Sequence, residues 1–162
     1  MAKTIKLIKI TRWIMVLLTL FAIATIFFPF ARETMLDGTI VEYPTLIAVF
    51  GGEFAFSDAS YDYTMSFSLN LWLVIAYQFA LLSSLAFFSS ARKKTNLIFG
   101  TILAFISMIA MIFMPFVVSF STPGFVLEGI AIAYGPILGA SALLAAEIIA
   151  LFHILSDIRY HK

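Results

Sequence analysis

Four long apolar runs constrain this chain more than any other feature. A bilayer core of about 30 Å is crossed by roughly 20 apolar residues in a helix, and four stretches are long enough: 10–30, 69–90, 97–118 and 134–156. The chain of 162 residues is 62% hydrophobic and only 12% charged, which excludes a soluble domain with a wettable surface. We therefore expect a single domain, 1–162, that is an all-α integral membrane protein built as a four-transmembrane-helix bundle. The first run lacks a small-residue cleavage site, so it is expected to stay uncleaved.

The charges predict how the four helices are oriented. Nine of the ten basic residues fall on one side of the predicted membrane: Lys3, Lys6, Lys9, Arg12, Arg92, Lys93, Lys94, Arg159 and Lys162. Lysine and arginine near short loops stay in the cytosol. We therefore expect a multi-pass protein of the plasma membrane with both termini cytoplasmic and with outer loops at 31–68 and 119–133.

The two outer loops are expected to form a small, partly β extracellular cap. Residues 39–43 read as a short strand that pairs with 125–128. Residues 45–50 are either a strand, turning at Gly51-Gly52 into 53–56, or one or two turns of interfacial helix. Aromatic side chains of the first loop suit the headgroup zone; they are Phe54, Phe56, Tyr61, Tyr63 and Phe67.

An internal repeat is visible at a shift of 86 residues. Residues 26–30 align with 112–116, and nine identities fall within 17–42, including Gly38 over Gly124. Because both aligned runs cross the membrane in the same direction, the sequence suggests a parallel 2+2 internal repeat. The aligned prolines, Pro29 and Pro115, are expected to end or kink their helices at the outer surface.

Glu147 is the one acid well inside a predicted span. Ionisable groups at that depth are costly and often functional, so a proton- or cation-linked site is one interpretation. The other is a neutral carboxyl that joins helices by hydrogen bonds. Polar groups at similar depths complete the predicted intramembrane site; they are Gln78, Ser83, Ser84, Ser107 and Thr19.

A second candidate site is a stripe of small residues on the last span. They recur at helical spacing and let helices approach closely, either within the bundle or against another subunit; they are Gly135, Gly139, Ala142, Ala146 and Ala150. A third candidate is an outer acidic face that solvates the cap or meets a basic partner. It comprises Glu42, Glu53, Asp58, Asp62 and Glu128.

The sequence offers no catalytic or metal signature. It has no cysteine, no HExxH cluster and no paired intramembrane histidines, so no metal and no cofactor are expected. Its predicted topology, with both termini inside, a large first outer loop and a short second one, resembles that of claudin-like tetraspan proteins. The tryptophan and cysteine signature of their first outer loop is absent, and no function is carried over. We expect a non-enzymatic scaffold or accessory subunit that contacts the lipid bilayer and another membrane protein or a second copy, and no nucleic acid. The alternatives are a small ion- or proton-coupled transporter using Glu147, and an unrecognised membrane enzyme.

Overall fold

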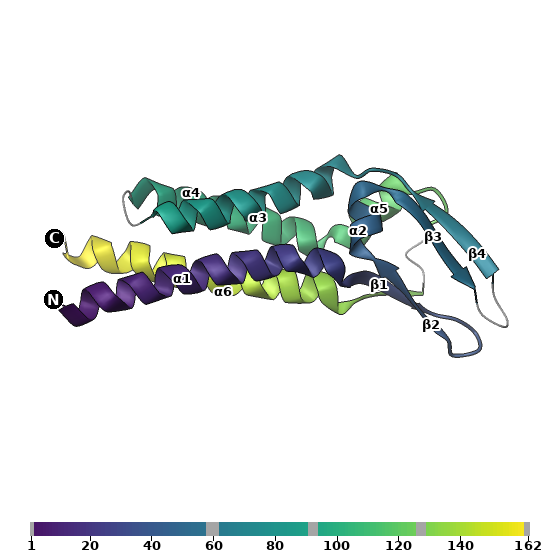
Figure 1. Ribbon diagram of the computed structural model, residues 1–162, viewed down its shortest axis with the longest axis horizontal. Coiled ribbons are helices and arrows are strands. Elements are labelled where there is room, and N and C mark those ends of the chain that lie inside the picture. The colour runs from purple at the N-terminus through teal and green to yellow at the C-terminus, as the bar shows by residue number, and fades with distance from the viewer. Residues whose placement is uncertain (1, 58–61, 91–93, 126–128, 161–162) are drawn as a thin grey trace.

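The computed structural model describes residues 2–57, 62–90, 94–125 and 129–160. Within these residues, four helices are long and apolar enough to span a membrane, as predicted. They are α1 (Ala2–Ala24), α3 (Leu71–Ser89), α4 (Lys94–Ile112) and α6 (Tyr134–Tyr160). The helices form one bundle in which α1 packs on α3 and α6, and α4 packs on the same two helices (Figure 1).

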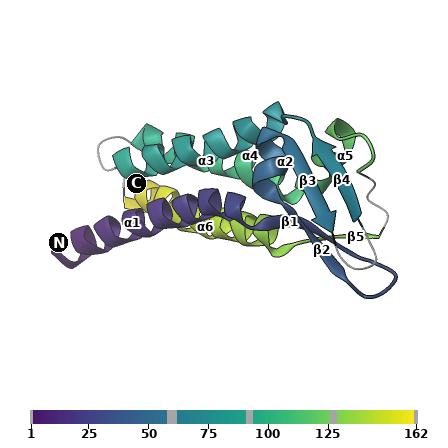
Figure 2. The same cartoon turned by 45° about the vertical axis from the view of Figure 1, so that its right-hand side comes forward.

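The strands and short helices gather at one end of this bundle, which we call the sheet end (Figures 1 and 2). At the opposite end, the terminal end, α1 begins and α6 finishes. The two chain ends therefore lie on the same side of the bundle, which agrees with an even number of crossings.

Small side chains fill the space between the four helices. Ala22, Ala80, Ala104 and Ala146 are almost completely buried, whereas large apolar side chains such as Phe152 point outward and are mostly exposed. In water this arrangement would leave a large apolar surface uncovered. Lipid covers such a surface without cost, and close approach of helices through small residues is the usual packing inside a bilayer.

Both aligned prolines lie where a long helix has already ended. The backbone leaves α1 through a 3₁₀ turn at Thr25–Phe27, and Pro29 begins a strand. Helix α4 stops at Ile112, and Pro115 lies in the first turn of the separate helix α5 (Met114–Ser121). The predicted spans 10–30 and 97–118 are thus too long at the sheet end, because proline cannot continue the helical hydrogen bonds.

A three-stranded antiparallel sheet joins the connections 31–68 and 119–133, with strand order β2-β1-β5. Its strands are β1 (Pro29–Thr34), β2 (Ile40–Pro44) and β5 (Ile130–Ile132). Strand β2 pairs with β1 through a turn at Asp37 and Gly38, where Gly38 has a φ of 88°. In the described residues β2 pairs with β1. The predicted pairing of 39–43 with 125–128 involves residues 126–128, which lie outside the described part of the chain, so it stays a prediction.

The segment 45–50 is the helix α2 (Thr45–Phe50), so the helical alternative is the right one. Gly51 ends this helix with a φ of 79°, a conformation that glycine adopts without strain. Residues 45–50 and 53–56 therefore do not form the hairpin that was one expectation for Gly51-Gly52. Instead, β3 (Gly52–Ser57) pairs with β4 (Asp62–Phe67) in a separate two-stranded sheet.

Four rings form an aromatic core that joins the two sheets. Each ring contacts the other three, with centroids 5.4 to 6.3 Å apart, and all four side chains are buried; they are Phe30, Tyr43, Phe67 and Phe125. Phe67 is therefore inside the protein and not at a lipid headgroup. Phe54, Phe56 and Tyr63 are partly buried against this core, and Tyr61 lies outside the described residues.

The two aligned copies of the suggested repeat differ after their prolines. Residues that follow Pro29 form a strand, whereas those that follow Pro115 form a helix. Gly38 and Gly124 nevertheless both adopt positive φ, 88° and 85°, in their respective turns. The repeat stays a prediction.

Candidate functional site

Glu147 lies in the interior of the bundle on α6. Its side chain is 6% exposed, and its Oε1 atom is buried without a hydrogen-bond partner. Ser107 Oγ on α4 is in the same situation, with the side chain fully buried. Within the described residues only one other buried side-chain polar atom lacks a partner, the Nε of Arg12.

Two of the hydroxyls predicted around Glu147 donate to backbone carbonyls instead. Thr19 Oγ1 donates to the carbonyl of Val16 at 2.9 Å, and Ser83 Oγ donates to the carbonyl of Gly100 at 2.8 Å. Ser84 is buried on α3. Gln78 is exposed on the outside of the bundle. The sequence could not predict this, because the apolar residues around Gln78 give α3 no clear polar face. Among the predicted hydroxyls, Ser107 is thus the one whose oxygen is buried without a hydrogen-bond partner.

The small-residue stripe of α6 packs inside the chain. A Cβ added to Gly139 would lie 2.7 Å from Met111 Sδ on α4 and 2.8 Å from Thr25 Oγ1. One added to Gly135 would lie 2.5 Å from the carbonyl oxygen of Pro29. The three alanines of the stripe, Ala142, Ala146 and Ala150, are also buried. The face is therefore occupied by α1 and α4 and is not free for a second subunit.

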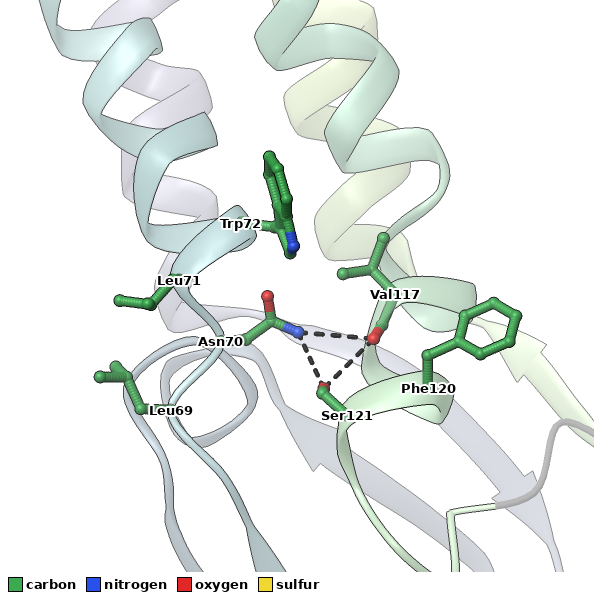
Figure 3. A pocket seen from close by; sticks show the side chains of 7 residues that line it. All are labelled: Leu69, Asn70, Leu71, Trp72, Val117, Phe120 and Ser121. Atoms are coloured by element: carbon green, nitrogen blue, oxygen red, sulfur yellow. Dashed lines mark hydrogen bonds between the residues drawn. The ribbon is translucent and has the colours of Figure 1, made fainter.

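A side-opening groove at the sheet end was not predicted from the sequence. It lies between the start of α3 and helix α5 and has a volume of about 610 Å³ (Figure 3). The residues that line it are mostly apolar; they are Leu69, Asn70, Leu71, Trp72, Val117, Phe120 and Ser121. Leu71 is 63% exposed, Trp72 is 76% exposed and Phe120 is 91% exposed.

Asn70 holds the two sides of this groove together. Its Nδ2 donates to Ser121 Oγ at 2.9 Å and to the carbonyl of Val117 at 3.4 Å (Figure 3). Its Oδ1 accepts from the backbone N–H of Leu73 and so caps α3. An asparagine directly before an apolar run is a recognisable helix start, but its partners on α5 come from a distant segment that spacing alone does not reveal.

A chain of three polar groups lies at the edge of the aromatic core. Tyr43 donates its hydroxyl to Glu33 Oε2 at 2.6 Å, and its oxygen lies 2.9 Å from the hydroxyl of Tyr63. Burial, together with the hydrogen bond to Glu33, raises the pKa of Tyr43 far above its usual range. Burial also raises the pKa of Tyr63. Both hydroxyls therefore stay protonated at neutral pH and hold β4 against β2.

The predicted acidic face is described in part. Glu42, Glu53 and Asp62 are exposed at the sheet end, whereas Asp58 and Glu128 lie outside the described residues. In the part of the chain that the structure describes, no three histidine, cysteine or acidic side chains come together as metal ligands.

Comparison with known proteins adds no relative. No family model matches the chain, and no curated protein matches it significantly. The fold alone therefore defines the class of protein. In the described residues it is a mostly helical chain with four candidate membrane-spanning helices and two small sheets at one end.

Proposed function

We propose that the chain is an accessory subunit or scaffold of a complex in the plasma membrane, with both termini in the cytosol and the sheet end outside. The observation that carries this proposal is the groove between α3 and α5. Leucine, tryptophan and phenylalanine side chains line it and remain largely exposed. Large aromatic side chains beside a concave surface are the usual anchors of a protein–protein contact.

The proposed occupant is an apolar membrane segment of another protein that carries basic residues at its outer end. The groove lies between the start of α3 and α5 (Figure 3), so with the four long helices in the bilayer an apolar helix of a partner can reach it. The described residues between 28 and 70 contain five acids against one base, Arg32. This excess of negative charge at the sheet end, where the groove also lies, complements a partner with the opposite sign.

Site-specific photo-crosslinking in native membranes tests the proposal. A benzophenone side chain placed at Trp72 or Phe120 should capture one discrete protein. Phe152 is the matched control, because it is similarly exposed but lies near the terminal end of α6. Capture of lipid alone at all three positions would reject the proposed subunit role.

A charge reversal separates a specific partner from a sticky apolar surface. The double variant Glu53→Lys and Asp62→Lys should reduce capture at Phe120 several-fold at low salt, and less at high salt. Capture that does not respond to this reversal would contradict the basic partner.

A further inference from the structure

Two unpartnered oxygens, one on Glu147 and one on Ser107, are the unexplained feature of the bundle interior. Both side chains are more than nine-tenths buried. Neither Glu147 Oε1 nor Ser107 Oγ has a hydrogen-bond partner in the described chain. A buried polar group without a partner is costly, and a buried charge is costlier still. The pair therefore indicates that something not supplied by the chain lies between them.

The register of the helices brings the two side chains to neighbouring levels. Helices α4 and α6 run in opposite directions, and Gly139 lies level with Met111 (Figure 1). Four residues along each helix from this contact, Ser107 is level with Leu143, about 6 Å along the axis from Glu147. Helical side chains lean toward the helix N-terminus. Glu147 thus leans toward the sheet end and Ser107 toward the terminal end, so that each approaches the other.

Glu147 also lies on the side of α6 that faces α4. The side facing α1 is marked by His153, whose Nε2 is 2.6 Å from Thr11 Oγ1, and by Gly135 against Pro29. Six residues separate Glu147 from His153, which turns it about 120° round the helix, away from α1. Glu147 thus meets both conditions for a shared site, level and direction, and Ser107 is fully buried in the bundle at a neighbouring level.

No cation of the described chain neutralises Glu147. On α1, Arg12 lies one residue from the level of His153, about 7.5 Å along the axis from Glu147, and leans away from it. On α6, His153 is hydrogen-bonded to Thr11, and on α4 the charged residue is Lys94, at the terminal end. Helix α3 contains no charged residue. A carboxylate at this position would be an unpaired charge, so the neutral acid fits the surroundings.

We propose that Glu147 and Ser107 form a proton-binding site, in which one water molecule bridges the protonated carboxyl to the serine hydroxyl. Buried waters are typically held by polar groups that otherwise lack partners. Two protein oxygens are too few for calcium, which needs six to eight. The site is independent of the groove and of any partner, because it lies between α4 and α6 inside the bundle.

Infrared difference spectroscopy on the purified protein in lipid tests the proposal. Raising the pH should remove the carbonyl stretch of one protonated carboxylic acid, and Glu147→Gln should abolish this band while keeping the size and shape of the side chain. The same acid should react with dicyclohexylcarbodiimide, an apolar reagent that attacks protonated buried carboxyls, and the adduct should map to Glu147 by mass spectrometry. If no band titrates and Glu147 stays unlabelled while the protein is folded, the proposal is wrong.

A matched pair of serine variants tests the partner in the site. Ser107→Ala removes one partner of the bridging water. Because this bridge stabilises the ionised carboxylate more than the protonated acid, the titration midpoint should rise by about 0.5–1 pH unit. Ser83→Ala is the control, because Ser83 is equally buried but its hydroxyl already bonds Gly100. Equal midpoints in the two variants would overturn the role of Ser107.

Discussion

In the helix bundle the buried side chains are mainly small, whereas at the sheet end four buried aromatic rings pack together. Ala22 and Ala146 let the helices touch, while Phe30 and Tyr43 fill a volume between two sheets. Small-residue contacts depend on lipid to cover the exposed outer faces of the helices. The aromatic core, by contrast, buries its own apolar surface and resembles the interior of a water-soluble domain. The two ends should therefore respond differently to substitution and to solvent.

The largest expected effect is loss of the sheet end alone. Phe30→Ala removes one of the four rings of the aromatic core and should destabilise the sheets by about 3–5 kcal/mol. Hydrogen exchange should speed up in β1, β2 and β5 and stay slow in the four long helices. Phe27→Ala is the control, since Phe27 is 76% exposed. Equal loss of protection in both ends would show that they do not unfold separately.

A smaller effect is expected from overpacking the bundle. Gly139→Leu places atoms where Met111 and Thr25 already are, which should cost about 1–3 kcal/mol and separate α6 from α4. The free energy of unfolding in mixed micelles measures this loss. Ser141→Leu serves as the comparison because Ser141 is exposed on the same helix. Similar stabilities for the two variants would mean that the stripe does not pack as described.

Removing one hydroxyl should weaken the link between the sheets. Tyr43→Phe loses the hydrogen bonds to Glu33 and Tyr63 and should cost about 1–2 kcal/mol, with the ring packing retained.

The same hydroxyl should make the sheet end sensitive to alkaline pH. The pKa of Tyr43 is raised by burial, so the unfolded chain releases this proton near pH 10 while the folded chain keeps it. Stability should therefore fall as the pH rises above about 10. Tyr43→Phe should weaken this dependence, with the part due to Tyr63 remaining because burial raises its pKa too, and Tyr134→Phe, a substitution at an exposed ring, should leave it unchanged.

The smallest effect is expected at Gln78. Because its side chain is exposed on the outside of α3, Gln78→Leu should change stability by less than about 0.5 kcal/mol. The free energy of unfolding in mixed micelles measures this change. A loss of 2 kcal/mol or more would place Gln78 in the interior polar layer after all.

The bundle could be predicted from the sequence because length and hydropathy are enough to define a membrane-spanning helix. The rotation of each helix about its own axis, which decides the residues that face the interior, could not be predicted from length and hydropathy. Glu147 is interior and Gln78 is not, yet both lie in runs that are apolar on every side. The hydrogen-bond partner of a hydroxyl, such as the Gly100 carbonyl for Ser83, depends on which helices are neighbours. The order of charges along the chain does not reveal which helices are neighbours.

Strand β1 was missed because the apolar run continues through Phe30 without a break. The turn at Asp37-Gly38 is a typical hairpin signal and would have placed a strand on each side of it. The groove at Asn70 was missed for another reason. Its second wall is α5, whose position depends on where α4 ends and how the chain turns at Phe113.

The pairing of β1 with β5 has a consequence for how the four helices can move. β1 follows α1 almost directly and β5 directly precedes α6, and the backbone N–H of Ala133 donates to the carbonyl of Phe30 at 3.1 Å. A ladder of main-chain bonds thus clasps the ends of α1 and α6. In the described residues the start of α3 is held by a single main-chain bond, from the Asn70 N–H to the carbonyl of Val49 at 3.0 Å, and by the Asn70 side chain. Any rocking of one helix pair against the other would pivot on the clasped pair and swing α3 and α4, the side on which the groove opens.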